Sequence, residues 1–319
     1  MVELFFPSMA YRIVFFGTPD IAVPSLQALA VDPRFEVVLC ISQPDKPQGR
    51  AHLPVATPVA GAAKTLGIPL LQPMTLGDPL VRSTLLEAQA DFFVVIAYGK
   101  ILRQEVLDMP RFAPINVHGS LLPKHRGASP IQATLLAGSP EAGITFMRMT
   151  AGMDEGPMLR SFAVPVTPQT TSGMLFVTLA QLAAEHVGDL LADYAEGHVS
   201  EQPQEESEAT LCGKFTKEMG HVDVQNHGAQ EIHRLWQALT PWPGIFTFHQ
   251  GKRIKLLQVR AVQEPPLTVG QMAQDKVAGA LLVGTREGTI ALDMVQPEGK
   301  KPMTGQAFFA GVHEHQFGQ

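Results

Sequence analysis

Two polar residues have types and a spacing that could serve acyl transfer. Asn116 and His118 are two positions apart in the run Ile115-Asn-Val-His-Gly-Ser-Leu-Leu-Pro123. Residues two apart in a strand share a face, so both side chains are expected to point the same way at a strand end. An amide N–H beside an imidazole that can donate or take up a proton suits stabilisation of an oxyanion. The alternative is that the two side chains only satisfy backbone groups where the strand ends, and the pattern alone leaves both readings open.

Asp154 lies in a loop bracketed by glycines, Gly152-Met-Asp-Glu-Gly-Pro157. A carboxylate here could orient His118 and stabilise its charged form, as the acid does in other sites that activate a nucleophile. The alternative is an ordinary turn, because Asp near Gly is common turn chemistry. Spacing alone does not choose between the two.

The usual signatures of nucleotide and metal chemistry are missing from the sequence. The first apolar run ends in Gly17-Thr-Pro-Asp20, a single glycine where a dinucleotide-binding fold requires three, and no Walker loop occurs. These absences disfavour a nicotinamide or ATP enzyme. No His-Glu-x-x-His run is present either, and we expect no metal at the site.

The first half of the chain alternates short apolar runs with segments of helical length. Continuous apolar runs of this length are typical of buried parallel strands. The runs are Arg12–Phe16, Phe35–Ile41, Ile68–Leu71 and Phe92–Ala97. Thr57-Pro58 and Ser129-Pro130 each predict the start of a helix, and Gly67 and Gly138 predict their ends. The pattern predicts a doubly wound α/β fold, which binds ligands at the carboxyl ends of its strands.

Further elements follow the helix that begins near Ser129. Ile144–Met149 is predicted as a strand with Leu159–Val166 as its antiparallel neighbour, and then a long helix carries one apolar stripe from Leu175 to Leu190. The segment 196–208 has five glutamates and no lysine or arginine, which is typical of a linker. After a short amphipathic helix at 229–239, four strand-like runs separated by glycine turns predict a small antiparallel β-barrel of OB-like type. The runs are Ile245–His249, Ile254–Val262, Ala278–Val283 and Thr289–Val295.

The expected domains are therefore a catalytic domain at 9–195, a linker at 196–215 and a C-terminal barrel at 216–319. Residues 1–8 are expected to form a disordered extension, with Met9 an alternative start. Residues 1–209 carry 13 Lys and Arg against 21 Asp and Glu, whereas residues 210–319 carry 11 against 9, giving net charges of -8 and +2. The mildly basic C-terminal third permits contact with RNA.

The composition bounds the class and compartment of the protein. With 319 residues and 45% hydrophobic residues, the chain is long enough for two domains with real cores. Its two cysteines cannot form a disulfide framework, which favours a reducing cytoplasm. Continuous apolar stretches such as Phe92–Ala97 are far shorter than the roughly 20 residues of a membrane span, so no membrane association is expected.

Several motifs resemble the formyltetrahydrofolate-dependent formyltransferase family, and more specifically its members that formylate methionyl-tRNA, across nearly the whole length from Met9. The Ser-Leu-Leu-Pro motif at 120–123 is shared by folate formyltransferases, whereas the loop around Arg50 and the C-terminal barrel are similar to the tRNA-dependent members. The matching stretches are Phe16-Gly-Thr-Pro-Asp20, Gln43-Pro-Asp-Lys-Pro47, Gly49-Arg50, Tyr98-Gly99, Asn116–Pro123, Arg126-Gly-Ala128, Gly143-Ile-Thr145, the Met-Asp-x-Gly loop at Asp154, Pro241-Trp-Pro243 and Gly299-Lys-Lys301.

The resemblance implies a reaction and assigns site residues. The α-amino group of methionine on initiator tRNA would attack the formyl carbon of 10-formyltetrahydrofolate, the co-substrate, without a metal. Asn116 and His118 would stabilise the tetrahedral oxygen, and Asp154 would hold His118 and assist proton movement. The folate site would be lined, mostly by backbone and apolar contact, by Ser120, Leu121, Leu122 and Pro123.

The resemblance also implies a macromolecular partner, methionyl initiator tRNA. Residues 43–58 form a longer polar connection than a βα loop needs, and excess loop usually means function. In the family this loop approaches the tRNA acceptor stem, so Arg50 is expected to contact tRNA, although Ala51 and His52 replace lysines that often follow it. Lysines and arginines after residue 213 could add phosphate contacts or form a merely solvated surface. We expect a monomer.

Two alternatives differ in class. A formyltransferase acting on a small amine, such as an amino-sugar nucleotide or a purine precursor, would use the same Asn, His and Asp. A non-catalytic RNA-binding protein could instead keep the α/β domain as a scaffold, but the presence of all three polar residues argues against it.

Overall fold

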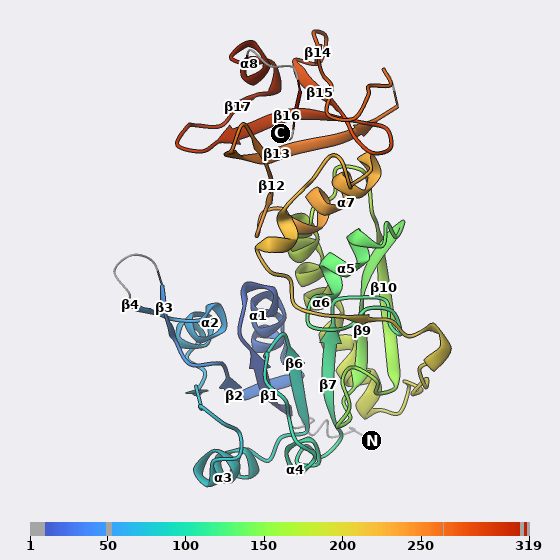
Figure 1. Cartoon of the computed structure of the whole chain (residues 1–319). Helices are drawn as coiled ribbons and strands as arrows, with labels where there is room; N and C mark the ends of the chain where they lie inside the picture. The colour runs from blue at the N-terminus through green and yellow to red at the C-terminus, as the bar shows by residue number, and fades with distance from the viewer. Residues whose placement is uncertain (1–9, 49–52, 264, 313–315, 318–319) are drawn as a thin grey trace, which may run out of the picture. The chain divides into compact units, whose positions relative to one another are not determined.

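A computed structural model describes residues 10–48, 53–263, 265–312 and 316–317 (Figure 1). The predicted extension 1–8, Met9 and Arg50 lie outside these described residues. The chain forms two compact units. Unit 1 comprises the chain up to 127 with 143–163 and 176–211, and unit 2 comprises 128–142, 164–175 and the chain from 212 onward. The domain limits predicted above stay a prediction.

Unit 1 is built on a seven-stranded, mostly parallel sheet, which confirms the predicted doubly wound α/β class. Its strands lie in the order β10-β9-β7-β6-β1-β2-β5. Their bounds are β1 Tyr11–Gly17, β2 Phe35–Ile41, β5 Leu70–Leu71, β6 Phe92–Ile96, β7 Ala113–His118, β9 Glu141–Arg148 and β10 Met158–Pro165. The pairs among β5, β2, β1, β6 and β7 are parallel, and β9 runs antiparallel to β7.

Helices cover both faces of this sheet, so its strands are buried on both sides. Alternate residues of β1 enter different layers. Val14 and Phe16 share one core cluster with residues of α3 and α4. The opposite face of the sheet carries Phe92 of the neighbouring strand β6, whose ring packs against Tyr194 of α6. The helices of unit 1 are α1 Val23–Val31, α2 Pro58–Leu66, α3 Pro79–Glu87, α4 Gln104–Leu107 and most of α6 Ser172–Ala195.

Local signals in the sequence define α2 closely. Thr57 is the N-cap, and its hydroxyl accepts a hydrogen bond from the backbone N–H of Ala60 at 3.2 Å. Pro58 follows at the first helical position, and Gly67 ends the helix in the left-handed region with φ +70°. These bounds confirm the helix predicted from Thr57-Pro58 and Gly67.

The topological switch point of the sheet lies between β1 and β6. From β1 the chain proceeds through β2 and β5 to one edge, and from β6 through β7 to the other. Ligands bind in such folds at the carboxyl ends of the strands beside this point. Here Thr18 Oγ1 and Gln43 Nε2 both donate to the carbonyl oxygen of Tyr98, at 3.0 and 2.8 Å, and tie these strand ends together. The carboxyl end of β7, which carries His118, lies beside that of β6 at the same edge of the sheet.

Unit 2 carries an antiparallel sheet with strand order β12-β13-β16-β15-β14, and β17 pairs with β16. The four predicted strand runs correspond to β12, β13, β15 and β16, so the antiparallel C-terminal domain is confirmed. Strands β14 and β17 and helix α8 were not predicted. The bounds are α5 Pro130–Leu136, α7 Ala229–Leu239, β12 Ile245–His249, β13 Lys252–Val262, β14 Met272–Asp275, β15 Ala280–Gly284, β16 Thr289–Pro297, β17 Met303–Thr304 and α8 Gly305–Ala310.

Four two- or three-residue strands complete the chain. β3 Lys46–Gln48 and β4 Leu53–Val55 pair with each other within the connection 43–58. β8 Arg126–Gly127 pairs with β11 Leu211–Cys212. Because β11 lies within the predicted linker 196–215, this pairing brings that segment beside the residues that follow β7.

Helix α6 is long and apolar enough to cross a membrane by length and composition alone. In the structure it is a core helix. Leu179, Val187 and Leu190 on its predicted stripe are completely buried, whereas Glu185 and Asp189 are exposed.

Candidate active site

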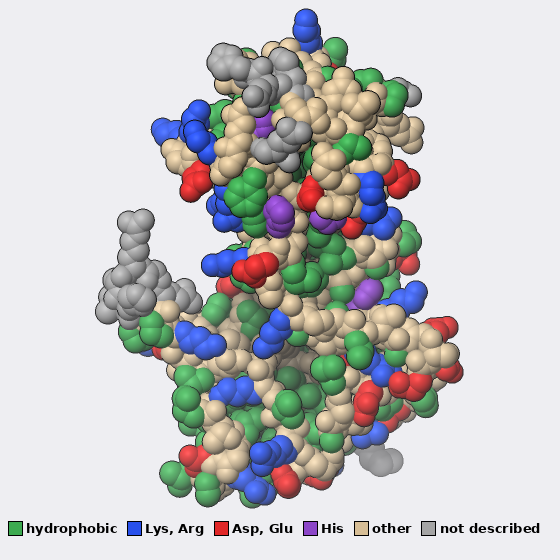
Figure 2. Space-filling view, in the orientation of Figure 1, with side chains coloured by type: hydrophobic (Ala, Val, Ile, Leu, Met, Phe, Trp, Pro, Cys, Tyr) green, Lys and Arg blue, Asp and Glu red, His purple; other side chains and the backbone are tan. Residues whose placement is uncertain are grey.

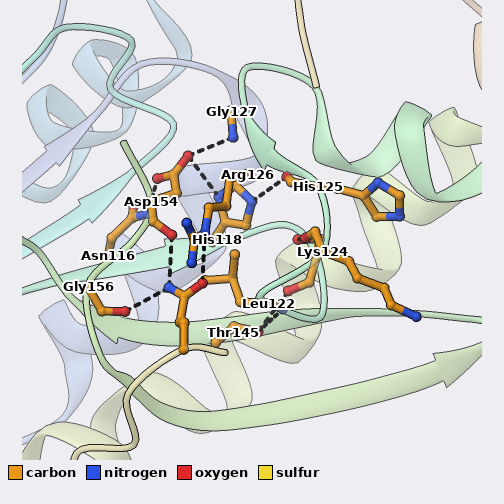
Figure 3. A network of polar contacts seen from close by, with 12 residues as sticks. Asn116, His118, Leu122, Lys124, His125, Arg126, Gly127, Thr145, Asp154 and Gly156 are labelled. Atoms are coloured by element: carbon orange, nitrogen blue, oxygen red, sulfur yellow. Dashed lines mark hydrogen bonds and ion pairs between the residues drawn. The ribbon is translucent and has the colours of Figure 1, made fainter. Parts of the chain in front are cut away.

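Asn116 and His118 end strand β7 on the face that the alternation predicts. They are paired in register with Met147 and Thr145 of β9. Only 8% and 5% of their surfaces are exposed. Asn116 Nδ2 lies 3.5 Å from Oδ1 of Asp154, and His118 Nδ1 lies 3.7 Å from Oδ2 of the same carboxylate (Figure 3). The structure therefore brings the three predicted catalytic residues together.

Asp154 closes this cluster from the loop between β9 and β10. Its backbone is left-handed, with φ +55°, a conformation that Asp tolerates better than most residues. Its Oδ2 accepts a hydrogen bond of 2.9 Å from the backbone N–H of Gly127. The side chain of Asp154 is 21% exposed, against 6% for that of His118, so the carboxylate lies at the open side of the cluster.

The ring orientation of His118 is set by a backbone carbonyl. His118 Nε2 lies 2.9 Å from the carbonyl oxygen of His125, which can only accept, so Nε2 is the protonated nitrogen (Figure 3). Nδ1 then faces Asp154 and is the atom free to take up a second proton. Burial lowers the pKa of the His125 imidazole itself, and the charges of Lys124 and His118 act in the same direction.

The residues predicted to line the folate site form a tied loop directly after β7. The Ser120 hydroxyl donates to the Lys124 carbonyl at 2.6 Å, and the Leu122 N–H donates to Thr145 Oγ1 at 3.0 Å. Ser120, Leu122 and Pro123 are buried, and Leu121 is half-buried. The Ser120 side chain is thus engaged within the loop, and the part of this loop in folate binding stays a prediction.

Three residues that support the site were not found from the sequence. Arg126 is 5% exposed, and its side chain donates from Nε to Gln204 and from both terminal nitrogens to Glu206. Gln204 in turn donates to the carbonyl oxygens of Asp154 and Gly156. Arg126 belongs to the Arg-Gly-Ala motif, which is the one signal that could have pointed to it. Gln204 and Glu206 lie in the glutamate-rich segment and carry no such signal.

An exposed face of β12 and β13 in unit 2 combines aromatic and basic side chains. Phe246 and Phe248 alternate with buried residues of β12 and lie opposite Lys255 and Arg253 in register. The Arg253 guanidinium stacks 3.7 Å from the centre of the Phe246 ring, and the ring of His221 lies within 6 Å of both phenylalanines. We call these five residues the β12–β13 face. Lys and Arg side chains are scattered, with acidic ones among them, over the side of unit 2 seen in Figure 2.

No group of three or more His, Cys, Asp or Glu side chains that could hold a metal occurs among the residues whose placement the structure gives. The arrangement at the end of β7 is one that can serve proton transfer and oxyanion stabilisation. A neutral amide donor and an imidazole share one face, and a carboxylate lies beside the imidazole.

Comparison with known proteins agrees with this chemistry. Residues 11–188 match the formyl transferase family, and residues 214–313 match the formyl transferase C-terminal domain. Solved structures of such enzymes share the fold. The sugar 3N-formyl transferase WlaRD, crystallised with dTDP and 5-N-formyl-THF, superposes with a TM-score of 0.67 at 17% identity, covering 92% of this chain and 100% of the other.

Sequence relatives extend over nearly the full length of the chain. The methionyl-tRNA formyltransferase of Roseiflexus castenholzii is 39% identical, covering 95% of this chain and 97% of its own. That of Thermus thermophilus is 40% identical, covering 92% and 93%. The chain belongs to the formyl transferase family, and these full-length relatives place it with the methionyl-tRNA formyltransferases.

Proposed function

We propose that the protein transfers the formyl group of 10-formyltetrahydrofolate to the α-amino group of methionyl initiator tRNA. The observation that carries the proposal is the cluster of Asn116, His118 and Asp154 at the carboxyl end of β7, in a chain whose full-length relatives are methionyl-tRNA formyltransferases.

In the proposed reaction the methionyl nitrogen attacks the formyl carbon, and a tetrahedral intermediate forms with negative charge on the former formyl oxygen. The C–N bond to folate N10 then breaks, and the proton lost by the amine goes to N10. Asn116 Nδ2 donates to this oxygen, and His118 donates to it from Nδ1 once that nitrogen has taken up the proton lost by the amine. Their burial strengthens these interactions because little water competes with them.

Asp154 has two parts in this proposal. It lies beside His118 Nδ1 and stabilises the imidazolium that forms when a proton arrives there. As the more exposed member of the cluster, it also stands where an entering amine first meets the site, and it assists the proton on its way to N10.

The two substrates are assigned to different parts of the chain. The loop of Ser120–Pro123 would bind folate through backbone and apolar contacts, next to the strand ends tied at Tyr98. Arg50 would contact the acceptor stem of the tRNA. The β12–β13 face in unit 2 has the composition of a surface for unpaired RNA, since bases stack on aromatic rings and phosphates pair with Lys and Arg. The protein would act in the cytoplasm as a monomer.

The test is a choice among acceptor amines. The protein is incubated with 10-formyltetrahydrofolate and, in separate reactions, charged initiator tRNA, charged elongator tRNA, glycinamide ribonucleotide and an amino-sugar nucleotide. Formylation of the charged initiator tRNA alone is expected. Efficient formylation of either small amine, with none on tRNA, would replace the proposal with a small-molecule formyltransferase.

A further inference from the structure

The distance between His118 and Asp154 is set by one tripeptide, His125-Arg126-Gly127. The carbonyl of His125 accepts the hydrogen bond of His118 Nε2 at 2.9 Å, and the N–H of Gly127 donates to Asp154 Oδ2 at 2.9 Å. Both catalytic side chains are therefore positioned by hydrogen bonds to the backbone of the same tripeptide (Figure 3). A shift of the tripeptide changes the separation of Nδ1 and Oδ2, which is 3.7 Å.

The tripeptide is held in place by residues 201–210, which overlap the glutamate-rich segment 196–208 and which we call the strap. Thr210 contacts it twice, through its Oγ1, which accepts from the His125 N–H at 2.8 Å, and through its carbonyl, which accepts from the Arg126 N–H at 2.8 Å. At its other end the strap pairs with the start of β10, where Gln202 and Met158 exchange two backbone hydrogen bonds of 2.8 Å. The strap thus spans the site from the tripeptide to the strand that follows Asp154.

Gln204 joins the two halves of this arrangement. Its Oε1 accepts from Arg126 Nε at 2.9 Å, and its two amide hydrogens reach the carbonyls of Asp154 at 2.8 Å and Gly156 at 2.7 Å. The Gln204 side-chain amide thus uses both of its N–H donors and one of the two lone pairs of its oxygen. The two carbonyls belong to the turn in which Asp154 has its left-handed backbone, so these hydrogen bonds hold that turn.

Arg126 supplies geometry more than net electrostatic energy. Its side chain is buried, whereas Glu206, which accepts two of its hydrogen bonds at 3.1 and 2.8 Å, is largely exposed. An exposed partner contributes little Coulomb energy, but the planar fork of Arg fixes both Gln204 and Glu206 in direction, which a lysine ammonium cannot do.

We infer that Gln204 and Arg126 are positioning residues for catalysis, which hold the Asp154 carboxylate at its working distance from His118 through the hydrogen bonds of the strap. The inference rests on the proposed function for its kinetic consequences, but the contacts that carry it do not involve either substrate. It gives the strap a role in the chemistry of unit 1, where the sequence suggested only a linker.

The variants are chosen in matched pairs. Gln204→Ala removes the amide that bridges Arg126 and the Asp154 loop. Gln202→Ala, in the same strap, removes an exposed amide whose one side-chain hydrogen bond goes to Ser200 Oγ. Arg126→Lys keeps the charge and removes the fork, and Glu205→Gln in the strap is its control.

The kinetic expectation is a loss in turnover without a loss in folate binding. Because small misplacements of catalytic groups are costly, Gln204→Ala and Arg126→Lys are expected to lower kcat by about tenfold or more. The dissociation constant of tetrahydrofolate and the Tm should change little. Gln202→Ala and Glu205→Gln should keep the wild-type kcat. If Gln204 acts through Asp154, the Gln204→Ala effect should shrink to about twofold or less in an Asp154→Asn background.

Amide hydrogen exchange of the apo protein gives a readout independent of activity. Loosening the strap should speed exchange of the Gly127 N–H, the donor to Asp154, in Gln204→Ala but not in Gln202→Ala. Unchanged Gly127 exchange, or an equal loss of kcat in wild-type and Asp154→Asn backgrounds, would overturn the inference. If the wild-type protein formylates no amine, the proposed function is wrong. The exchange comparison would still decide whether the strap holds the Asp154 loop.

Discussion

The two units of this protein use polar residues in opposite ways. At the end of β7 in unit 1, Asn116, His118 and Arg126 are nearly buried, and each is tied by hydrogen bonds. On the β12–β13 face of unit 2, Arg253 and Lys255 are exposed and form no ion pair within the described part of the chain. Buried and oriented groups can stabilise charge at one point, whereas exposed cations can attract an extended polyanion. In the proposed function, the buried cluster serves the chemistry and the exposed face serves docking of tRNA.

The largest effect is expected from the catalytic cluster. His118→Ala, Asn116→Ala and Asp154→Asn should each lower kcat by on the order of a hundredfold or more, because each group meets charge that develops in the transition state. Double variants should lose less than the product of the single losses, because the groups act together. Single-turnover formylation at saturating tRNA measures this, and wild-type turnover in any single variant at unchanged Tm would remove that residue from the site.

A smaller effect, of a different kind, is expected from the β12–β13 face. Arg253→Ala with Lys255→Ala should reduce kcat/KM for charged tRNA and leave kcat at saturation unchanged. Each lost phosphate contact should lower the slope of log affinity against log salt by about 1. Lys276→Ala, an exposed lysine in the turn after β14, is the control and should leave the slope unchanged. A fall in kcat at saturation would mean that this face takes part in chemistry.

Arg50 should behave like the docking surface, with a more modest loss. Arg50→Ala is expected to raise KM for charged tRNA several-fold, about the cost of one exposed phosphate contact, with tetrahydrofolate binding nearly unchanged. Calorimetric titration with tetrahydrofolate checks the second part. A parallel loss of folate affinity would place the 43–58 loop in the folate pocket.

The smallest effect concerns stability and pH. Burial lowers the pKa of His125, so on acidification the unfolded chain takes up a proton at this residue before the folded chain does. The free energy of unfolding should therefore fall as pH drops through about 6.5, the ordinary range of histidine. His125→Asn, which suits the left-handed φ of +60° there, should flatten this dependence. Urea denaturation at pH 7.5 and 5.5 measures it, with the exposed His198→Asn as control, and an unaltered pH dependence would contradict the assignment.

The shared face of Asn116 and His118 and the bounds of α2 could be predicted from the sequence because they depend on short-range patterns. Asn116 and His118 share a face by strand alternation, and α2 has its caps within its own segment. The fold class also follows from buried apolar runs. Strand β14 was not found because Met272 is its one buried residue, which leaves no alternation to detect.

The position of the strap could not be predicted for a different reason. Gln204 bonds to carbonyls about 50 residues away in the chain, and Arg126 reaches Glu206 across 80 positions. Such contacts depend on tertiary packing, and no local pattern encodes them. The many glutamates of the strap favoured the interpretation as a solvated linker. Most of its side chains are in fact exposed, and only its contacts with the site were missed. The proximity of Asp154 to His118 was likewise open on spacing alone and rested on the family resemblance.

The most direct test of the separation between chemistry and docking is the salt dependence of single-turnover formylation of methionyl initiator tRNA. It compares the wild type, Asp154→Asn and the Arg253→Ala, Lys255→Ala double variant. Asp154→Asn is expected to lower the rate at saturating tRNA at every salt concentration and to keep the wild-type salt slope of kcat/KM. The double variant should keep the saturated rate and lose part of the slope. If both variants lower the same parameter with the same salt dependence, chemistry and docking are not divided between the two units.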